Sequence, residues 1–437
     1  MNGNLGLNKP LIFAAIIALP ASVALAENRQ QLTAVTEVRY DDNIFLDASD
    51  QEQEEYQLIG GFDYLFEGEG SRYKATLDYR GRAAYDDKDT QEDDTEFSGT
   101  ASIVAKLIED RITWRIYHER SEQRADRRDV DIRQNRETRN LYGTGPTMQL
   151  PLTRVDALSL EVDHQEIRYQ GSDNPLIANT RSDSERDRAS LQFSHQTSSV
   201  STVFAGYTYI ESSFDNDDDD IEFEQSFIGY RSELADGEYS VQIGYNESER
   251  DNGETAKGEL VQVNWTRSNA ARELNITAIK QLSDSSAGIG IGVTGYDPVE
   301  NGNYGDIDIV DRTYVDVDYV DNRLCKRCSV AVGLTYNDED FESTANDEVE
   351  TGYRASINYR MNRRTSLLVG ADMSTIEFDA EDREDDWRDY FAKVNWEVAR
   401  RTSLSLRLTQ EERESDAALI DDYEDFSVEL ILQHEVL

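Results

Sequence analysis

The 437-residue chain is poor in the residues that several common protein classes depend on. It has two cysteines, six prolines and four histidines, and its 44 basic residues face 89 acidic ones. The formal charge of −45 argues against nucleic-acid binding, because phosphate contacts need a basic surface. So few prolines in so long a chain favour long, uninterrupted secondary-structure elements.

Long apolar runs are also lacking. Beyond residue 26 no stretch approaches 18 consecutive apolar residues, so we expect no transmembrane helix. The first 26 residues carry only one charge, Lys9, followed by the apolar run Leu11–Leu19 and a small-residue cleavage site at Ala24–Ala26. This pattern predicts a secretory signal peptide over residues 1–26. Its removal leaves 43 basic residues against 89 acidic ones, a formal charge of −46 for residues 27–437.

What the chain does have is a repeated alternation of residue types, and Arg72–Asp94 shows it most clearly. Its aromatic and small residues, from Tyr73 to Tyr85, fall on one phase, and its basic residues fall on the other. Side chains alternate between the two faces of a strand, so this segment has one face suited to hydrocarbon and one suited to water. We expect Tyr73 and Tyr85 to mark the two membrane interfaces. The acidic tract that follows predicts an outer loop.

The breaks between such segments are of two kinds, short and long, and they alternate along the chain. Short breaks recur about every 40 residues, which corresponds to two strands and one long loop per period. The pattern predicts an all-β fold: a transmembrane up-and-down antiparallel β-barrel of about 20 strands (range 16–20), with short periplasmic turns and long acidic outer loops. The alternation is irregular over Ile221–Arg231 and Thr365–Phe378, which suggests either a bulge or a wrongly placed strand boundary.

A soluble β-sandwich also has strands with one apolar face. Strands of about 12 to 15 residues exceed the usual globular length, and the regular asymmetry of the loops is typical of a barrel. We therefore expect residues 27–437 to form a single outer-membrane barrel domain.

The inward phase contains a set of basic side chains that could line the lumen. They either pair with acidic residues across strands or guide an anionic solute. The candidate row is Arg72, Lys74, Arg80, Arg82, Arg115, Arg354, Arg360 and Arg407.

Cys325 and Cys328 flank a predicted two-residue turn. That spacing is compatible with a disulfide, which export makes favourable, and two idle thiols are the alternative. Zinc would need two more ligands nearby, which the sequence does not show.

Nothing in the sequence predicts an enzyme or a cofactor. The four histidines, His118, His164, His195 and His434, continue the lipid-facing rows near strand ends, and no nucleophile, zinc or phosphate-loop motif is present. The tract Asp215–Asp220 begins like a calcium loop but lacks its glycine and its final glutamate. It is either a solvated loop or a weak Ca²⁺ or Mg²⁺ site.

The stretch Val38–Phe45, with the sequence VRYDDNIF, resembles a recurring opening in outer-membrane β-barrel porins encoded with exopolysaccharide biosynthesis and exosortase systems. The repeated Arg-Thr-Ser-Leu at Arg364–Leu367 and Arg401–Leu404 is similar to sequences in the same group. The resemblance implies a barrel that assists polysaccharide export or biofilm surface assembly, and it brings no catalytic residues.

Taken together, these features predict a channel or accessory conduit in the outer membrane of a Gram-negative bacterium. Its expected partners are membrane lipid, lipopolysaccharide, the barrel assembly machinery and polysaccharide export components, but no nucleic acid. A surface barrel with a plugged lumen is the main alternative, and a barrel-embedded hydrolase is a third.

Overall fold

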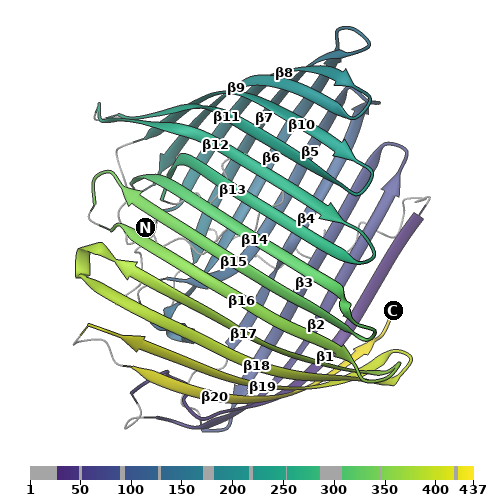
Figure 1. Ribbon diagram of the computed structural model, residues 1–437, viewed down its shortest axis with the longest axis vertical. Coiled ribbons are helices and arrows are strands. Elements are labelled where there is room, and N and C mark those ends of the chain that lie inside the picture. Colours follow the sequence, from purple (N-terminus) through teal and green to yellow (C-terminus); the bar gives the residue numbers. More distant parts are fainter. Residues whose placement is uncertain are drawn as a thin grey trace, which may run out of the picture.

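The computed structural model describes residues 27–48, 52–88, 94–125, 129–170, 182–215, 220–251, 253–285, 308–344, 346–417 and 422–437. The predicted signal peptide lies outside the described residues. Twenty antiparallel strands run obliquely around one closed wall (Figure 1). Their bounds are β1 (Glu27–Asp41), β2 (Glu55–Gly70), β3 (Tyr73–Asp86), β4 (Asp94–Ile108), β5 (Ile112–Arg124), β6 (Arg136–Pro151), β7 (Asp156–Gln170), β8 (Ser184–Ser198), β9 (Ser201–Phe214), β10 (Ile221–Leu234), β11 (Gly237–Arg250), β12 (Thr255–Ser268), β13 (Arg272–Asp284), β14 (Ile309–Cys325), β15 (Cys328–Phe341), β16 (Glu348–Arg360), β17 (Thr365–Phe378), β18 (Arg383–Ala399), β19 (Thr402–Ser415) and β20 (Tyr423–Glu435).

The barrel is up-and-down, as the sequence predicts. Each strand pairs with its neighbours in sequence, and β1 also pairs with β20 from Thr33↔Glu435 to Asp41↔Ser427. Pairing the first strand with the last closes the sheet, so neither strand is left as an open edge. The described part of the chain contains only two short 3₁₀ helices, η2 (Arg133–Asn135) and η3 (Asp379–Glu381). Neither has the length or apolarity of a membrane-crossing helix.

Short turns and longer connections lie on opposite rims. The turns after the even-numbered strands hold two to four residues, as between Gly70 and Tyr73 or between Cys325 and Cys328. The connections on the other rim are mostly longer, so we call the two rims the short-turn rim and the long-loop rim. Register shifts in the described strands occur only beside short turns, as at Asp321/Cys325 and Glu397/Ala399.

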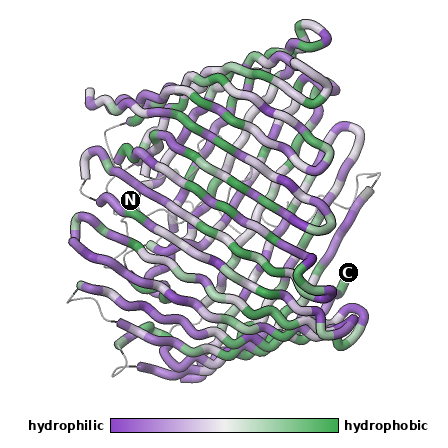
Figure 2. The backbone as a smooth tube through the Cα atoms, in the orientation of Figure 1, coloured by the Kyte–Doolittle hydropathy of each residue, from purple (hydrophilic) through white to green (hydrophobic). Residues whose placement is uncertain are grey.

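The outer face carries an apolar band, because the outward phase of the strands is apolar away from its charged residues near the long-loop rim. In β10 to β12 the directly opposed residues Ile228, Ile243 and Val261 form one such row, and Ile228 and Ile243 are 53% and 54% exposed. Hydrophobic and hydrophilic residues alternate along the strands in Figure 2. A soluble protein rarely leaves such a continuous apolar surface uncovered, whereas a bilayer would cover it. Tyr73 and Tyr85 lie at opposite ends of β3 on this phase.

The two irregular segments are not bulges, which excludes one of the two explanations that the sequence suggests. Ile221–Arg231 pairs without a register shift on both sides, and so does Thr365–Phe378. The alternation is irregular in β10 because Ile221 and Phe223, both fully buried, point inward. A dry cluster inside the barrel, described below, explains these apolar residues.

The stretch Val38–Phe45 lies at the seam where β1 meets β20. Asp42 exchanges two hydrogen bonds with the backbone of Phe426, at 3.3 and 2.7 Å. The fully buried Asn43 donates from Nδ2 to the carbonyl oxygens of Asp47 (2.8 Å) and Glu424 (2.9 Å), and its Oδ1 accepts from Asp47 N (3.0 Å). Both residues therefore help to close the barrel at the long-loop rim.

Replacing Asn43 with alanine should weaken this seam. The change leaves two carbonyls and one N–H without their buried partner, a cost of about 1–3 kcal/mol. We expect the folded, heat-modifiable band to convert to the unfolded form at a lower temperature than in the wild type. The exposed Asn358 is the control, because its replacement by alanine removes no such bonds. An unchanged transition in Asn43→Ala would show that the seam does not depend on this side chain.

Candidate functional site

The lumen wall is built from the inward phase of the strands, and it is polar. Four members of the predicted basic row, Arg80, Arg82, Arg115 and Arg354, form separate ion pairs on it. Arg82 Nη2 lies 2.6 Å from Asp63 Oδ1, and Arg354 Nη2 lies 2.7 Å from Asp316 and 3.0 Å from Asp318.

The surroundings of the members of the predicted row differ. Arg80 donates to Ser98 at 2.8 Å and approaches Glu96 at 3.9 Å, and Arg115 lies 3.8 Å from Asp163. Lys74 lies in β3 near the short-turn rim and Arg360 is the last residue of β16, while Arg72 belongs to the turn between β2 and β3. Arg407 lies 5.9 Å from the ring centroid of Phe391. The structure therefore places the row at several heights and does not join it into one continuous strip.

One part of the wall turns into the lumen: the end of the β13–β14 hairpin at the long-loop rim. The pairing of β12 with β13 stops at Val261↔Lys280, although β13 remains paired with β14 as far as Asp284↔Ile309. Leu282 shares its phase with the outward residues of β13, but it is only 1% exposed and lies at Gly258 of β12. An outward-phase side chain can contact the inner face of a neighbouring strand only if its own strand lies inside the barrel. We call residues Gln281–Ser285 and Asp308–Val310 the inward tip.

Apolar residues line the contact between the inward tip and the wall. Leu282 and Ile309 of the tip pack with buried, inward-phase residues of β9, β10 and β12, and none of the cluster is more than 6% exposed. The wall residues are Ile210, Phe214, Ile221, Phe223 and Ala256. This contact is a small dry core within the otherwise polar lumen.

Two buried ion pairs fasten the inward tip. Arg186 of β8 donates to both oxygens of Asp284, at 3.0 and 2.8 Å, and Arg250 of β11 donates to Asp308 at 2.6 Å. Both carboxylates are fully buried. Asp308 also accepts bonds from the backbone of Ser343 (3.0 Å) and from Thr344, which ties the tip to the β15–β16 connection. Buried charges are stable only when paired in this way.

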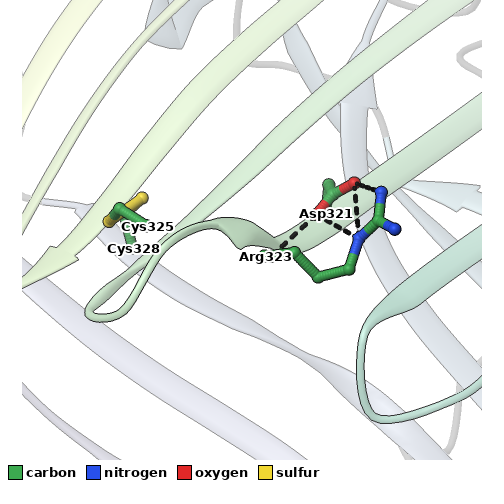
Figure 3. Close-up of a disulfide and its surroundings, with 4 residues drawn as sticks. All are labelled: Asp321, Arg323, Cys325 and Cys328. Atoms are coloured by element: carbon green, nitrogen blue, oxygen red, sulfur yellow. Dashed lines mark hydrogen bonds and ion pairs between the residues drawn. A yellow bond between two sulfur atoms is a disulfide. The ribbon is translucent and has the colours of Figure 1, made fainter.

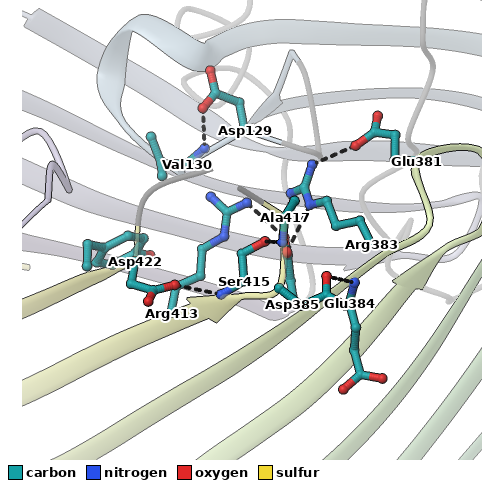
Figure 4. A network of polar contacts seen from close by, with 12 residues as sticks. Asp129, Val130, Glu381, Arg383, Glu384, Asp385, Arg413, Ser415, Ala417 and Asp422 are labelled. Carbon is teal, nitrogen blue, oxygen red and sulfur yellow. Dashed lines mark hydrogen bonds and ion pairs between the residues drawn. The ribbon is translucent and has the colours of Figure 1, made fainter. Parts of the chain in front are cut away.

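A second buried network lies between β18 and β19 at the same rim (Figure 4). Arg383 forms a bidentate contact with Asp385, and Arg413 donates to the same carboxylate at 2.8 Å. Arg383 also donates to Glu381 of η3 at 2.9 Å. Together the ion pairs brace the long-loop rim from within.

Four carboxylates form a row across β17 to β20. The register pairs Asp372 with Asp389, Asp389 with Glu411 and Glu411 with Asp425, all on the inward phase. The first three line a cavity of about 410 Å³ that also contains Trp387 and Arg354. The sequence did not reveal this row, because the apolar inward residues of β17, such as Leu368 and Ile376, obscured its phase.

The histidines do not form a catalytic site within the described residues. All four lie on the outward phase, as predicted, but His118 and His164 are near the middle of their strands and not near the ends. His118 Nδ1 lies 2.6 Å from the Tyr79 hydroxyl. His434 Nδ1 lies 3.0 Å from the Thr402 hydroxyl, whereas His164 and His195 contact carboxylates, Asp187 at 2.8 Å and Asp156 at 2.7 Å. In these contacts no histidine of the described residues joins both a hydroxyl and an orienting carboxylate. A general base needs a nucleophile within reach.

Metal binding is not evident in the part of the chain that the structure describes. No group of three histidine, cysteine or acidic residues there has metal-ligand geometry. Residues 216–219 of the candidate calcium tract lie outside the described residues. At its first position, Asp215 accepts a bond of 2.7 Å from Arg168.

Cys325 and Cys328 are joined by a disulfide across the β14–β15 turn, with their Cα atoms 5.3 Å apart (Figure 3). Beside it, Arg323 donates to Asp321 from its backbone (2.7 Å) and from its guanidinium group (2.7 Å). Both contacts stiffen the bulged end of β14 at the short-turn rim.

A closed 20-stranded wall with an apolar outer face and a polar lumen defines the fold as that of an outer-membrane β-barrel. The FrpB iron transporter of Neisseria meningitidis (F5-1 variant, apoprotein form) has the same kind of fold, with a TM-score of 0.51 and 9% identity over 94% of this chain and 81% of that one. Its F3-3 variant gives a TM-score of 0.50 at 9% identity, covering 94% and 82%. Pseudomonas aeruginosa OccK2 gives a TM-score of 0.43 at 10% identity, and the match covers 94% of this chain and 99% of OccK2. No family model and no curated protein sequence matches the chain.

Proposed function

We propose that the chain is a channel of the outer membrane of a Gram-negative bacterium. The observation that carries this proposal is the exposed apolar band on the outward phase of the strands, set against an inward phase that is mostly polar and contains ion pairs. Membrane lipid and lipopolysaccharide contact the apolar phase, and the assembly machinery inserts the barrel after export by the signal peptide. By the usual rule for such barrels, the short-turn rim is periplasmic and the long-loop rim faces outward.

The solute pathway that we propose is a conduit, or an accessory to one, in exopolysaccharide export or surface assembly. This part rests on the resemblance of Val38–Phe45 to barrels encoded with exopolysaccharide systems. In this chain Asp42 and Asn43 of that stretch bond to β20 and the adjoining loop, so they contribute to barrel closure.

A structural or adhesive surface barrel with a plugged lumen is the second candidate. The inward tip favours it, because the tip occupies lumen space on the β9–β12 side. A barrel hydrolase has no comparable support from the described residues.

Planar-bilayer recording separates the two leading candidates. An open channel gives steady single-channel steps from purified, folded protein, whereas a plugged barrel inserts and gives none. A deletion strain then tests the polysaccharide role. We expect less surface polysaccharide than in the parent strain and recovery on complementation, and an unchanged amount would refute that role.

A further inference from the structure

The carboxylate row on β17 to β20 places four acidic side chains side by side, and the Tyr423 hydroxyl donates a hydrogen bond to one of them, Glu411. Asp372, Asp389 and Glu411 are directly opposed on successive strands, and Asp425 continues the row. Directly opposed like charges destabilise a sheet by up to about 1 kcal/mol per pair. None of the four forms an ion pair in the described part of the structure.

Most of the neighbouring arginines are bonded elsewhere, but Arg354 and Arg407 still act electrostatically on Asp372, and Arg407 on Asp389. At one end Arg354 binds Asp316 and Asp318. At the other end Arg39 binds Asp41 at 2.7 Å, and toward the long-loop rim Arg413 binds Asp385 at 2.8 Å. Lys393 and Arg407 lie four residues from Asp389 and Glu411 toward the short-turn rim, about 13 Å along the strands.

Two buried oxygens of the row have no hydrogen-bond partner. They are Asp389 Oδ1 and Asp425 Oδ1, and Asp425 as a whole is only 6% exposed. An unsatisfied buried carboxylate oxygen costs free energy unless a ligand or ion completes its shell. Asp372, Asp389 and Glu411 line a cavity of about 410 Å³, so an ion in the lumen can approach these three carboxylates.

The surroundings favour a cation over a sugar ring. The aromatic group beside the row, Trp387, already lies against the guanidinium groups of Arg413 (5.0 Å) and Arg124 (5.6 Å). Its ring is therefore engaged by cations and is not free to stack on a saccharide. A single chelated metal is also excluded for the described residues, because no three of these groups converge on one point. Of these ligands, hydrated or organic cations that bind loosely along the row fit the arrangement best.

We propose that Asp372, Asp389, Glu411 and Asp425 form a cation-binding track on the lumen wall. The track makes the channel cation-selective, since carboxylate rings raise the local concentration of cations and exclude anions. This inference rests on the proposed channel function and specifies its solute class. It assigns selectivity to this acidic row and not to the predicted basic row.

The test compares the wild type with the variant Asp372→Asn/Asp389→Asn/Glu411→Gln/Asp425→Asn. The matched control changes one outward carboxylate on each of the same strands: Glu377→Gln, Glu384→Gln, Glu414→Gln and Glu424→Gln. Heat-modifiable migration first establishes that all three proteins are folded. Reversal potentials are then measured in planar bilayers under a KCl gradient.

We expect the wild type and the control to pass K⁺ about threefold or more over Cl⁻, and the row variant to approach equal permeability. A wild-type channel that is non-selective or anion-selective overturns the inference, and so does a row variant that keeps the wild-type ratio.

A second readout does not depend on conduction. Calorimetric titration with hexaamminecobalt(III) in 0.1 M KCl should show one more bound equivalent for the wild type and the control than for the row variant. If folded protein gives no current but shows this difference, the channel function fails and the cation track stands. If the titrations are equal, the track itself is refuted.

Discussion

Replacing Asp284 and Asp308 together with alanine should release the inward tip and enlarge the conducting pathway. The change removes the carboxylates that pair with the buried Arg186 and Arg250, and breaking a buried ion pair by removing one partner costs about 3–5 kcal/mol. This cost exceeds what the small dry core around Leu282 can offset, so the tip is expected to leave the wall.

Single-channel conductance and limited proteolysis measure the effect. We expect larger current steps than in the wild type and new cleavage near the β13–β14 connection in the folded protein. Glu222→Ala, which removes an exposed outward carboxylate of β10, is the control and should change neither. Unchanged conductance and protection in the double variant would mean that the tip is held without these two pairs.

An arginine on the outer face should be far more costly than an arginine on the neighbouring lumen position. Ile243 is near the middle of β11, on the exposed apolar phase, and Gln242 is on the inward phase. An arginine facing lipid near the bilayer centre destabilises a barrel by about 2–4 kcal/mol, whereas a lumen arginine remains hydrated.

We therefore expect Ile243→Arg to lower the folded fraction and the denaturant midpoint in lipid vesicles, and Gln242→Arg to change both little. The single-residue offset makes the pair a matched comparison, because the two variants share the strand, the height and the added charge. Equal effects, or a larger effect at Gln242, would contradict the assignment of the two faces.

Much of this architecture follows from the sequence, because one face of a barrel strand contacts lipid and the other contacts water. The residue types on the two faces therefore differ. Segments such as Tyr73–Tyr85 show the alternation directly, and the basic, short turns mark where pairs of strands reverse. Twenty strands and the even count are confirmed by the pairing of β1 with β20. The two-residue turn between Cys325 and Cys328 also lies where the sequence predicts it.

The functional features of the lumen were harder to predict, because they depend on contacts between residues far apart in the chain. Nothing local to Asp284 indicates that its partner is Arg186, 98 residues away. Ile221 and Phe223 disturb the alternation of β10 because they pack against the inward tip, and from sequence alone that disturbance suggests a bulge. The acidic row becomes visible only when the register aligns β17 to β20.

Closure of the barrel is the central claim, and the β1–β20 seam tests it most directly. Thr36 and Leu432 are directly opposed across the seam on the outward phase. Such residues have Cβ atoms about 5 Å apart, within reach of a short bis-thiol cross-linker. The experiment uses Thr36→Cys/Leu432→Cys in a Cys325→Ser/Cys328→Ser background, with Thr36→Cys/Gln433→Cys as a control whose thiols lie on opposite faces. The structure predicts efficient intramolecular cross-linking of the folded Thr36/Leu432 variant, seen as a covalently closed chain with altered migration after unfolding. No cross-link in folded protein, or links only between separate molecules, would contradict a closed 20-stranded barrel.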